Sequence, residues 1–168
     1  MSTSNSQNRI PDNVARHAGI VMTQAASIAS ALKVGELICP FAVITKDEKR
    51  QSIEFEATTQ DEAVSKGWDS FAALKHQVDI WSLAREGLQR GADGKEDVLV
   101  VVAWTQGMIE PAVFTQRFVS KANGGFALLG PIAISDQPSS ELGRIAAGFT
   151  EGIQDHPKGH LWDSWHRD

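Results

Sequence analysis

One segment concentrates the side chains that could bind a metal ion: Asp155, His156, His160, Asp163 and His166. Imidazole nitrogens and carboxylate oxygens are the protein ligands that zinc and similar metals take. Spacings of four and six residues would bring the three histidines together if this segment folded back on itself. Pro157 and Gly159 interrupt any helix, however, so no regular geometry fixes the ligands. Two hypotheses remain open: a metal site made of His156, His160, His166 and Asp163, or a set of solvated side chains.

The other ionisable residues have simpler interpretations. Glu54 and Glu56 lie on one face of an expected edge strand, where two carboxylates can share acid–base work or simply keep the edge soluble. His17 and His76 lie on expected helices, one turn from apolar residues, which favours ordinary positions at a helix surface or boundary. None of these residues predicts a catalytic centre by its spacing.

Common cofactor and catalytic motifs are absent from the sequence. There is no Walker-type glycine loop, no G-x-G-x-x-G, no G-x-S-x-G, no H-E-x-x-H and no C-x-x-C. The run Asn123-Gly124-Gly125 is typical of a hairpin turn rather than of a phosphate-binding loop. We therefore expect no cofactor, and the sequence favours a protein that is not an enzyme.

Composition narrows the class of protein. The 168 residues fit one domain, with 42% hydrophobic and 22% charged residues. The formal net charge of −5 disfavours a general nucleic-acid binder, which needs a basic face to neutralise phosphates. Residues 1–9 are polar, unlike a secretory peptide, and no apolar run reaches the roughly 20 residues of a membrane span. We expect a cytoplasmic protein that binds neither nucleic acid nor membrane.

Three helices are expected from apolar periodicity. The first runs from about residue 12 to 34, with the apolar stripe Val14, Ala18, Val21, Ala25, Ile28 and Leu32. A capping box at residues 59–62 opens the second, and helical spacing continues through Trp68, Phe71 and Trp81 as far as Arg90. The second helix would then be long enough to overhang its sheet. A third helix starts at Pro138 and ends at Pro157.

Five strands are expected between these helices, at residues 37–46, 52–58, 98–104, 109–121 and 126–134. The strand at 52–58 alternates apolar and polar residues, which suits a sheet edge, whereas the strands at 37–46, 98–104 and 126–134 are apolar on both faces. The predicted fold is an α+β domain with a single antiparallel five-stranded sheet, the element order α-ββ-α-βββ-α and helices on both faces. We expect a disordered tail at 1–10, one domain at 11–156 and an extension at 157–168.

This element order, over about residues 12–156, resembles the profilin-like arrangement of roadblock and longin domains. The resemblance is one of topology and implies that the second helix covers one face of the sheet and the terminal helices cover the other. It also implies that strand 98–104 lies at a sheet edge, where a second subunit would supply its partner strand.

Tryptophans point to further contact surfaces. Trp162 and Trp165 lie in a segment with few other apolar residues, so they are expected to pack against their own domain or a neighbouring subunit. The predicted interface residues are Val98, Val100, Val102, Trp104, Trp81, Trp162 and Trp165. The leading functional hypothesis is thus a non-enzymatic binding or assembly module acting as a homodimer. The alternatives are a small-ligand binder or metal-assisted hydrolase that uses the histidine cluster, and an acidic immunity or inhibitor protein.

Overall fold

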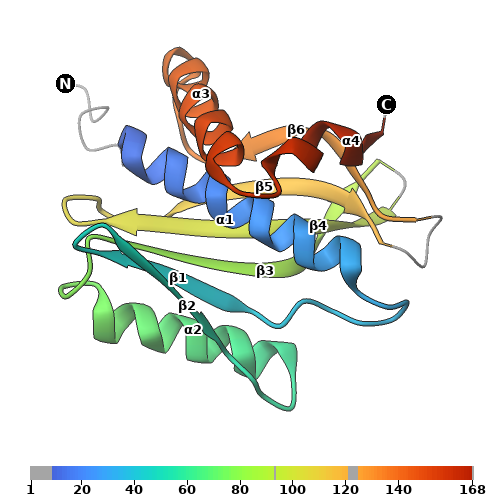
Figure 1. Cartoon of the computed structure of the whole chain (residues 1–168), viewed down its shortest axis with the longest axis horizontal. Helices are drawn as coiled ribbons and strands as arrows, with labels where there is room; N and C mark the ends of the chain where they lie inside the picture. Colours follow the sequence, from blue (N-terminus) through green and yellow to red (C-terminus); the bar gives the residue numbers. More distant parts are fainter. Residues whose placement is uncertain (1–8, 93, 121–124, 168) are drawn as a thin grey trace.

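The computed structural model describes residues 9–92, 94–120 and 125–167 (Figure 1). The chain forms one seven-stranded sheet with the order β2-β1-β3-β4-β5-β6-β7. Neighbouring strands pair antiparallel, except that β7 runs parallel to β6. The strands are β1 (Phe41–Lys46), β2 (Lys49–Glu54), β3 (Ile80–Gly91), β4 (Gly94–Thr105), β5 (Ala112–Val119), β6 (Ala127–Ile134) and β7 (His166–Arg167).

Helices cover both faces of the sheet. Helices α1 and α3 lie on one face and α2 lies on the other (Figure 1). A short 3-10 turn and a short helix, α4, then lead into β7. The bounds are α1 (Asp12–Ala31), α2 (Gln60–Leu74), α3 (Ser139–Asp155), η3 (Gly159–Leu161) and α4 (Trp162–Trp165). None of the helices in the described part of the chain is long and apolar enough to cross a membrane.

Helices α1 and α3 touch through their backbones. A Cβ atom built on Gly19 of α1 would lie 2.0 Å from the carbonyl oxygen of Phe149, and one built on Gly152 of α3 would lie 1.9 Å from that of Arg16. Only a hydrogen atom fits at either position. This close contact with α3 fixes the position of α1 over the sheet. It therefore determines which strand residues the side chains of α1 contact.

Each face of the sheet has its own core. On the α1 side, the fully buried Phe41, Leu99 and Phe114 pack with the alanine-rich stripe of the helix. On the α2 side, Trp81 is fully buried, and its ring centroid lies 4.6 Å from that of Phe71 and 5.6 Å from that of Trp68. Both cores hold large apolar side chains, so the sheet is the middle layer of the molecule.

The prediction of a single antiparallel five-stranded sheet is wrong, chiefly because of residues 80–91. These residues form strand β3, not the second half of a long helix. Helix α2 ends at Leu74, whose carbonyl oxygen accepts hydrogen bonds from the backbone N–H groups of Gln77 and Val78. Strand β3 then pairs with β1 and with the whole length of β4. Backbone pairing on both sides outweighs the helix propensity of this segment.

The strand order also differs from the profilin-like order. Residues 98–104 belong to β4, which lies inside the sheet between β3 and β5, so they offer no edge for a second subunit. Val98, Val102 and Trp104 are buried within the chain, as is Trp81. The homodimer thus loses the exposed edge strand that was one of the reasons for expecting it, and it stays a prediction. Strand β2 lies at one edge of the sheet, as the alternation predicts, but it covers Lys49–Glu54 rather than 52–58.

The segment after α3 folds back onto the domain. Trp162 packs against Phe149 with 6.2 Å between ring centroids, and Trp165 packs against Phe126 with 5.9 Å. Both tryptophans are partly buried against the core on the α1 side. Asn123 and Gly124, on which the hairpin prediction depends, lie outside the described residues, as do residues 1–8 of the expected tail.

Candidate functional site

The side chain of His17 is buried where α1 crosses the sheet. Its exposed fraction is 4%, and both ring nitrogens have hydroxyl partners. Nδ1 lies 2.6 Å from Oγ of Ser82 on β3, and Nε2 lies 3.0 Å from Oγ1 of Thr45 on β1. A neutral imidazole has one donor and one acceptor nitrogen, and a hydroxyl can play either part. The three side chains therefore form a satisfied buried polar chain joining a helix to two strands.

Burial keeps this imidazole neutral. Burial, and to a smaller extent the positive charge of Arg50, lower the pKa of His17 to about 4. A buried imidazolium would lose its hydration and would face a guanidinium at the same time. At neutral pH, His17 is therefore uncharged and acts as a hydrogen-bonding group.

An open pocket of about 340 Å³ lies beside this polar chain. The lining residues, which define the His17 pocket, are Asn13, Arg16, His17 and Ile20 of α1, Thr45, Glu48 and Arg50 of the β1–β2 hairpin, and Ile80 of β3. Its volume is near the lower end of the roughly 300 to 1,000 Å³ that small-ligand sites have. Six of the eight lining residues are polar or charged and two are isoleucines, so this pocket is more polar than most small-ligand sites.

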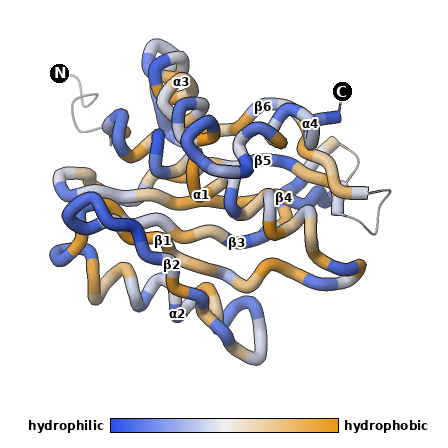
Figure 2. Tube along the Cα trace, in the orientation of Figure 1, coloured by the Kyte–Doolittle hydropathy of each residue, from blue (hydrophilic) through white to orange (hydrophobic). Residues whose placement is uncertain are grey.

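Strand register places one wall of the His17 pocket. Thr45 stands opposite Arg50 on β2 and opposite Ile80 on β3, so the three side chains lie in one row on the same face of the sheet. The adjoining turn is tight, with positive φ values of 51° at Asp47 and 67° at Glu48. The turn is held by the backbone N–H of Asp47, which donates to Oδ2 of Asp79 over 2.9 Å. Figure 2 shows this β1–β2 turn as strongly hydrophilic.

The charges around the His17 pocket are unevenly compensated. Arg16 forms an ion pair with Asp155 at the end of α3. Arg50, in contrast, has neither an ion pair nor a side-chain hydrogen bond within the described residues. Its field also reaches His156, whose pKa is lowered by burial first and then by Arg50 and Lys158. The guanidinium of Arg50 is therefore available to a ligand.

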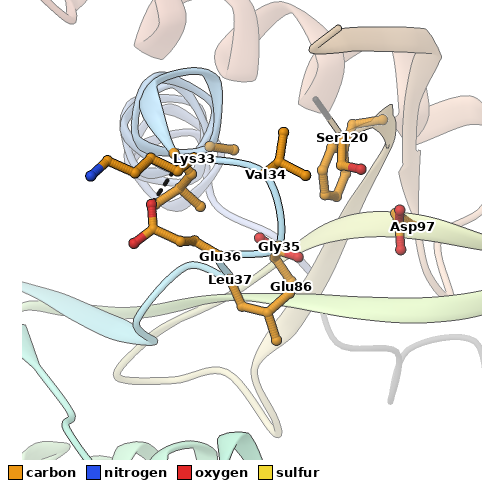
Figure 3. Close-up of a pocket in the computed structure, with 11 residues that line it drawn as sticks. Lys33, Val34, Gly35, Glu36, Leu37, Glu86, Asp97 and Ser120 are labelled. Carbon is orange, nitrogen blue, oxygen red and sulfur yellow. Dashed lines mark hydrogen bonds between the residues drawn. The ribbon is translucent and has the colours of Figure 1, made fainter. Parts of the chain in front are cut away.

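A second pocket lies near the other end of α1 (Figure 3). Glu86 of β3 and Asp97 of β4 line it together with the loop at residues 33–37. Burial raises the pKa of Glu86, the hydrogen bond from the backbone N–H of Ile38 opposes that rise, and Asp97 adds to it. Since Glu86 accepts this bond over 3.0 Å, its carboxylate has a structural role in holding the strand entry. The cavity is also smaller, at about 120 Å³, so it is the weaker candidate.

Two of the three histidines predicted to bind metal make hydrogen bonds with backbone groups. His166 places Nδ1 3.1 Å from the carbonyl oxygen of Trp162 and Nε2 3.2 Å from that of Gly130. Nδ1 of His156 accepts a hydrogen bond from the backbone N–H of Lys158. His160 and Asp163 are exposed. Across residues 9–92, 94–120 and 125–167, no three histidine, cysteine, aspartate or glutamate side chains gather as a metal site. The metal hypothesis stays a prediction without support from this geometry.

The two carboxylates at the end of the edge strand, Glu54 and Glu56, act on the nearby thiol of Cys39. Glu54 ends β2, Glu56 follows it, and both are exposed. They share an open pocket with Cys39, a thiol whose pKa is raised by burial and then by these two carboxylates. A raised thiol pKa lowers the fraction of reactive thiolate at neutral pH. This arrangement therefore does not favour nucleophilic chemistry at Cys39.

The interpretation of His17 as an ordinary surface or boundary residue is wrong. A histidine at the helix surface would have an exposed ring, whereas the ring of His17 is buried. One signal in the sequence was available: His17 lies three residues after Val14 and four before Val21, both on the buried stripe of α1. Its partners Ser82 and Thr45 are distant in the sequence, and no local pattern indicates them.

Comparison with known proteins does not extend these conclusions. The chain matches no protein-family model, no curated protein and no solved structure. The function must therefore be inferred from the geometry of the chain itself.

Proposed function

We propose that this protein is a non-enzymatic binding protein whose small-molecule ligand occupies the His17 pocket. One observation carries the proposal: a buried, fully hydrogen-bonded polar chain forms the wall of an open pocket that also exposes an unpaired guanidinium, that of Arg50, among the described residues. A rigid polar wall and a few convergent polar groups are what orient a small ligand.

The arrangement does not suit hydrolysis, although Ser82 and His17 lie at the distance of a nucleophile and its base. Ser82 has no exposed surface, so its hydroxyl cannot reach the reacting carbon of a bound substrate. A pKa of about 4 also makes His17 a weak general base at neutral pH. The same features favour a fixed hydrogen-bonding surface, which is what a binding protein needs.

The test is a two-dimensional NMR titration of ¹⁵N-labelled protein with a library of neutral and charged small fragments. The proposal predicts that shifts of bound fragments cluster on the amides of residues 13–20 and 45–50. Asn13→Trp should fill the pocket mouth and abolish those shifts, whereas Ala31→Trp, at the other end of α1, should leave them unchanged. Shifts that scatter over the surface, or that survive in Asn13→Trp, would contradict the proposal.

A further inference from the structure

We infer that the ligand of the His17 pocket is a small organic anion whose carboxylate or phosphate group is bound by Arg50. This inference rests on the proposed function, because it names the chemical class of the ligand for the same pocket. It goes further, since a pocket of this size could equally take a neutral molecule or a cation.

Charged side chains of both signs line the His17 pocket. Arg16 and Arg50 bring two positive charges and Glu48 brings one negative charge, while His17 is neutral. The chain as a whole has a formal net charge of −5. Since Asp155 offsets Arg16, the lining as a whole is close to neutral, and the local attraction for an anion comes from the guanidinium of Arg50.

The two arginines of the pocket differ in their partners. The positive charge of Arg16 is already compensated by the carboxylate of Asp155, so the role of Arg16 at the pocket is mainly structural. Arg50 has no such partner within the described part of the chain and lies in the same row of the sheet as Thr45 and Ile80. The planar guanidinium presents donors in a fork that matches carboxylate and phosphate oxygens. The anionic group is therefore assigned to Arg50.

The remaining lining residues indicate what the rest of the ligand is. The amide of Asn13 can donate to further oxygens, and Ile20 and Ile80 provide an apolar wall. A free inorganic ion would leave that wall without a partner. A carboxylate or phosphate attached to an apolar body uses both parts of the lining, which is why the inferred class is an organic anion.

The inference is tested with four probes of matched shape: benzoate, phenyl phosphate, benzamide and benzyl alcohol. Isothermal titration calorimetry gives the dissociation constants, and the amide shifts of residues 13–20 and 45–50 show where each probe binds. Benzoate or phenyl phosphate should bind more tightly than the two neutral probes. The relative affinity of these two anions identifies which anionic group the pocket prefers.

Variants assign the charge to its residue. Arg50→Gln should weaken anion binding by about tenfold to a hundredfold, the loss expected for a hydrogen bond to a charged group. Arg50→Lys should weaken it less, because it keeps the charge and loses the fork. The matched control is Arg90→Gln, an exposed residue near the far end of β3. Thermal unfolding of each variant confirms that it is folded, and β2 is an exposed edge strand that tolerates polar changes.

The possible results distinguish a failure of the anion assignment from a failure of the proposed binding function. If neutral probes shift the pocket amides and anions do not, the protein binds ligands there but the anion assignment is wrong. Equal anion affinity in Arg50→Gln and the unchanged protein would also overturn the assignment. If no probe shifts these amides, and the fragment titration is silent as well, both proposals fail.

Discussion

Nδ1 of His17 lies 2.6 Å from Oγ of Ser82, although 65 residues separate them in the chain. This contact joins α1 to β3 at the wall of the His17 pocket, and the contact of Nε2 with Thr45 joins the same helix to β1. The helix is therefore held at a fixed depth over the sheet by hydrogen bonds as well as by apolar packing. Both the stability of the domain and the shape of the pocket depend on this polar chain.

Removing the Ser82 hydroxyl should destabilise the protein. Ser82→Ala leaves a buried ring nitrogen of His17 without its partner, which costs about 1 to 3 kcal/mol of the free energy of unfolding. Ser52→Ala is the matched control, because Ser52 and Ser82 stand on opposite sides of Val43 in the same row and Ser52 is exposed. The control should change stability by less than about 0.5 kcal/mol. Urea unfolding measures both, and similar losses for the two variants would contradict the assigned role of the contact.

Acid should weaken the fold through His17. The pKa of the buried ring is about 4 in the folded protein, below the ordinary value of 6.5. As the pH falls, the His17 ring is therefore protonated in the unfolded chain before it is protonated in the folded protein. The resulting stability is complete above about pH 6.5 and is lost as the pH falls towards 4, by about 3 kcal/mol. His17→Gln keeps hydrogen-bonding groups but does not titrate, so its stability should fall by that much less between pH 7 and pH 4.

Other groups titrate in the same range, so the comparison of the two proteins isolates His17. The lowered pKa of His156 acts in the same direction as that of His17, and the raised pKa of Glu86 acts in the opposite direction. Both are present in the variant. Urea unfolding at several pH values gives the two curves, and parallel curves would show that His17 is not the source of the acid sensitivity.

The backbone contact between α1 and α3 should not tolerate a methyl group. In Gly152→Ala the new Cβ would collide with the carbonyl oxygen of Arg16, and the helices would have to separate at a cost of about 1 to 3 kcal/mol or more. The control is Gly143→Ala in the same helix, where a Cβ would meet nothing within 4 Å. Alanine there should stabilise the protein by about 0.5 to 1 kcal/mol. Thermal unfolding distinguishes the two, and equal melting temperatures would argue against the close crossing.

Local patterns predicted part of the fold. The stripe of α1, the capping box of α2 and the alternation of the edge strand all have local causes, and the structure contains each of these elements. Thr59 accepts the hydrogen bond from the backbone N–H of Glu62 that the capping box implies. The α+β class follows from these elements.

The failure at β3 has an equally physical cause. Val78, Trp81 and Leu88 continue the helical spacing of α2, and Leu83, Ala84, Arg85 and Glu86 are good helix formers. No glycine or proline marks the end of α2 at Leu74. What decides the conformation is pairing with β1 and β4 on both sides, which involves residues far away in the chain. Once β3 is missed, Ser82 is misplaced, and the polar chain with His17 cannot be predicted.

The central claim is tested most directly by the pKa of His17 with and without a bound anion. Binding an anion beside the ring should stabilise the imidazolium, so the account predicts that a saturating concentration of phenyl phosphate or benzoate raises the pKa of His17 above its value of about 4. The measurement is an NMR titration of the ring carbon resonances, with His160, which is exposed and does not line the pocket, as an internal control. An unchanged pKa at His17 under saturating anion, or an equal rise at His160, would contradict the claim that the anion occupies the His17 pocket.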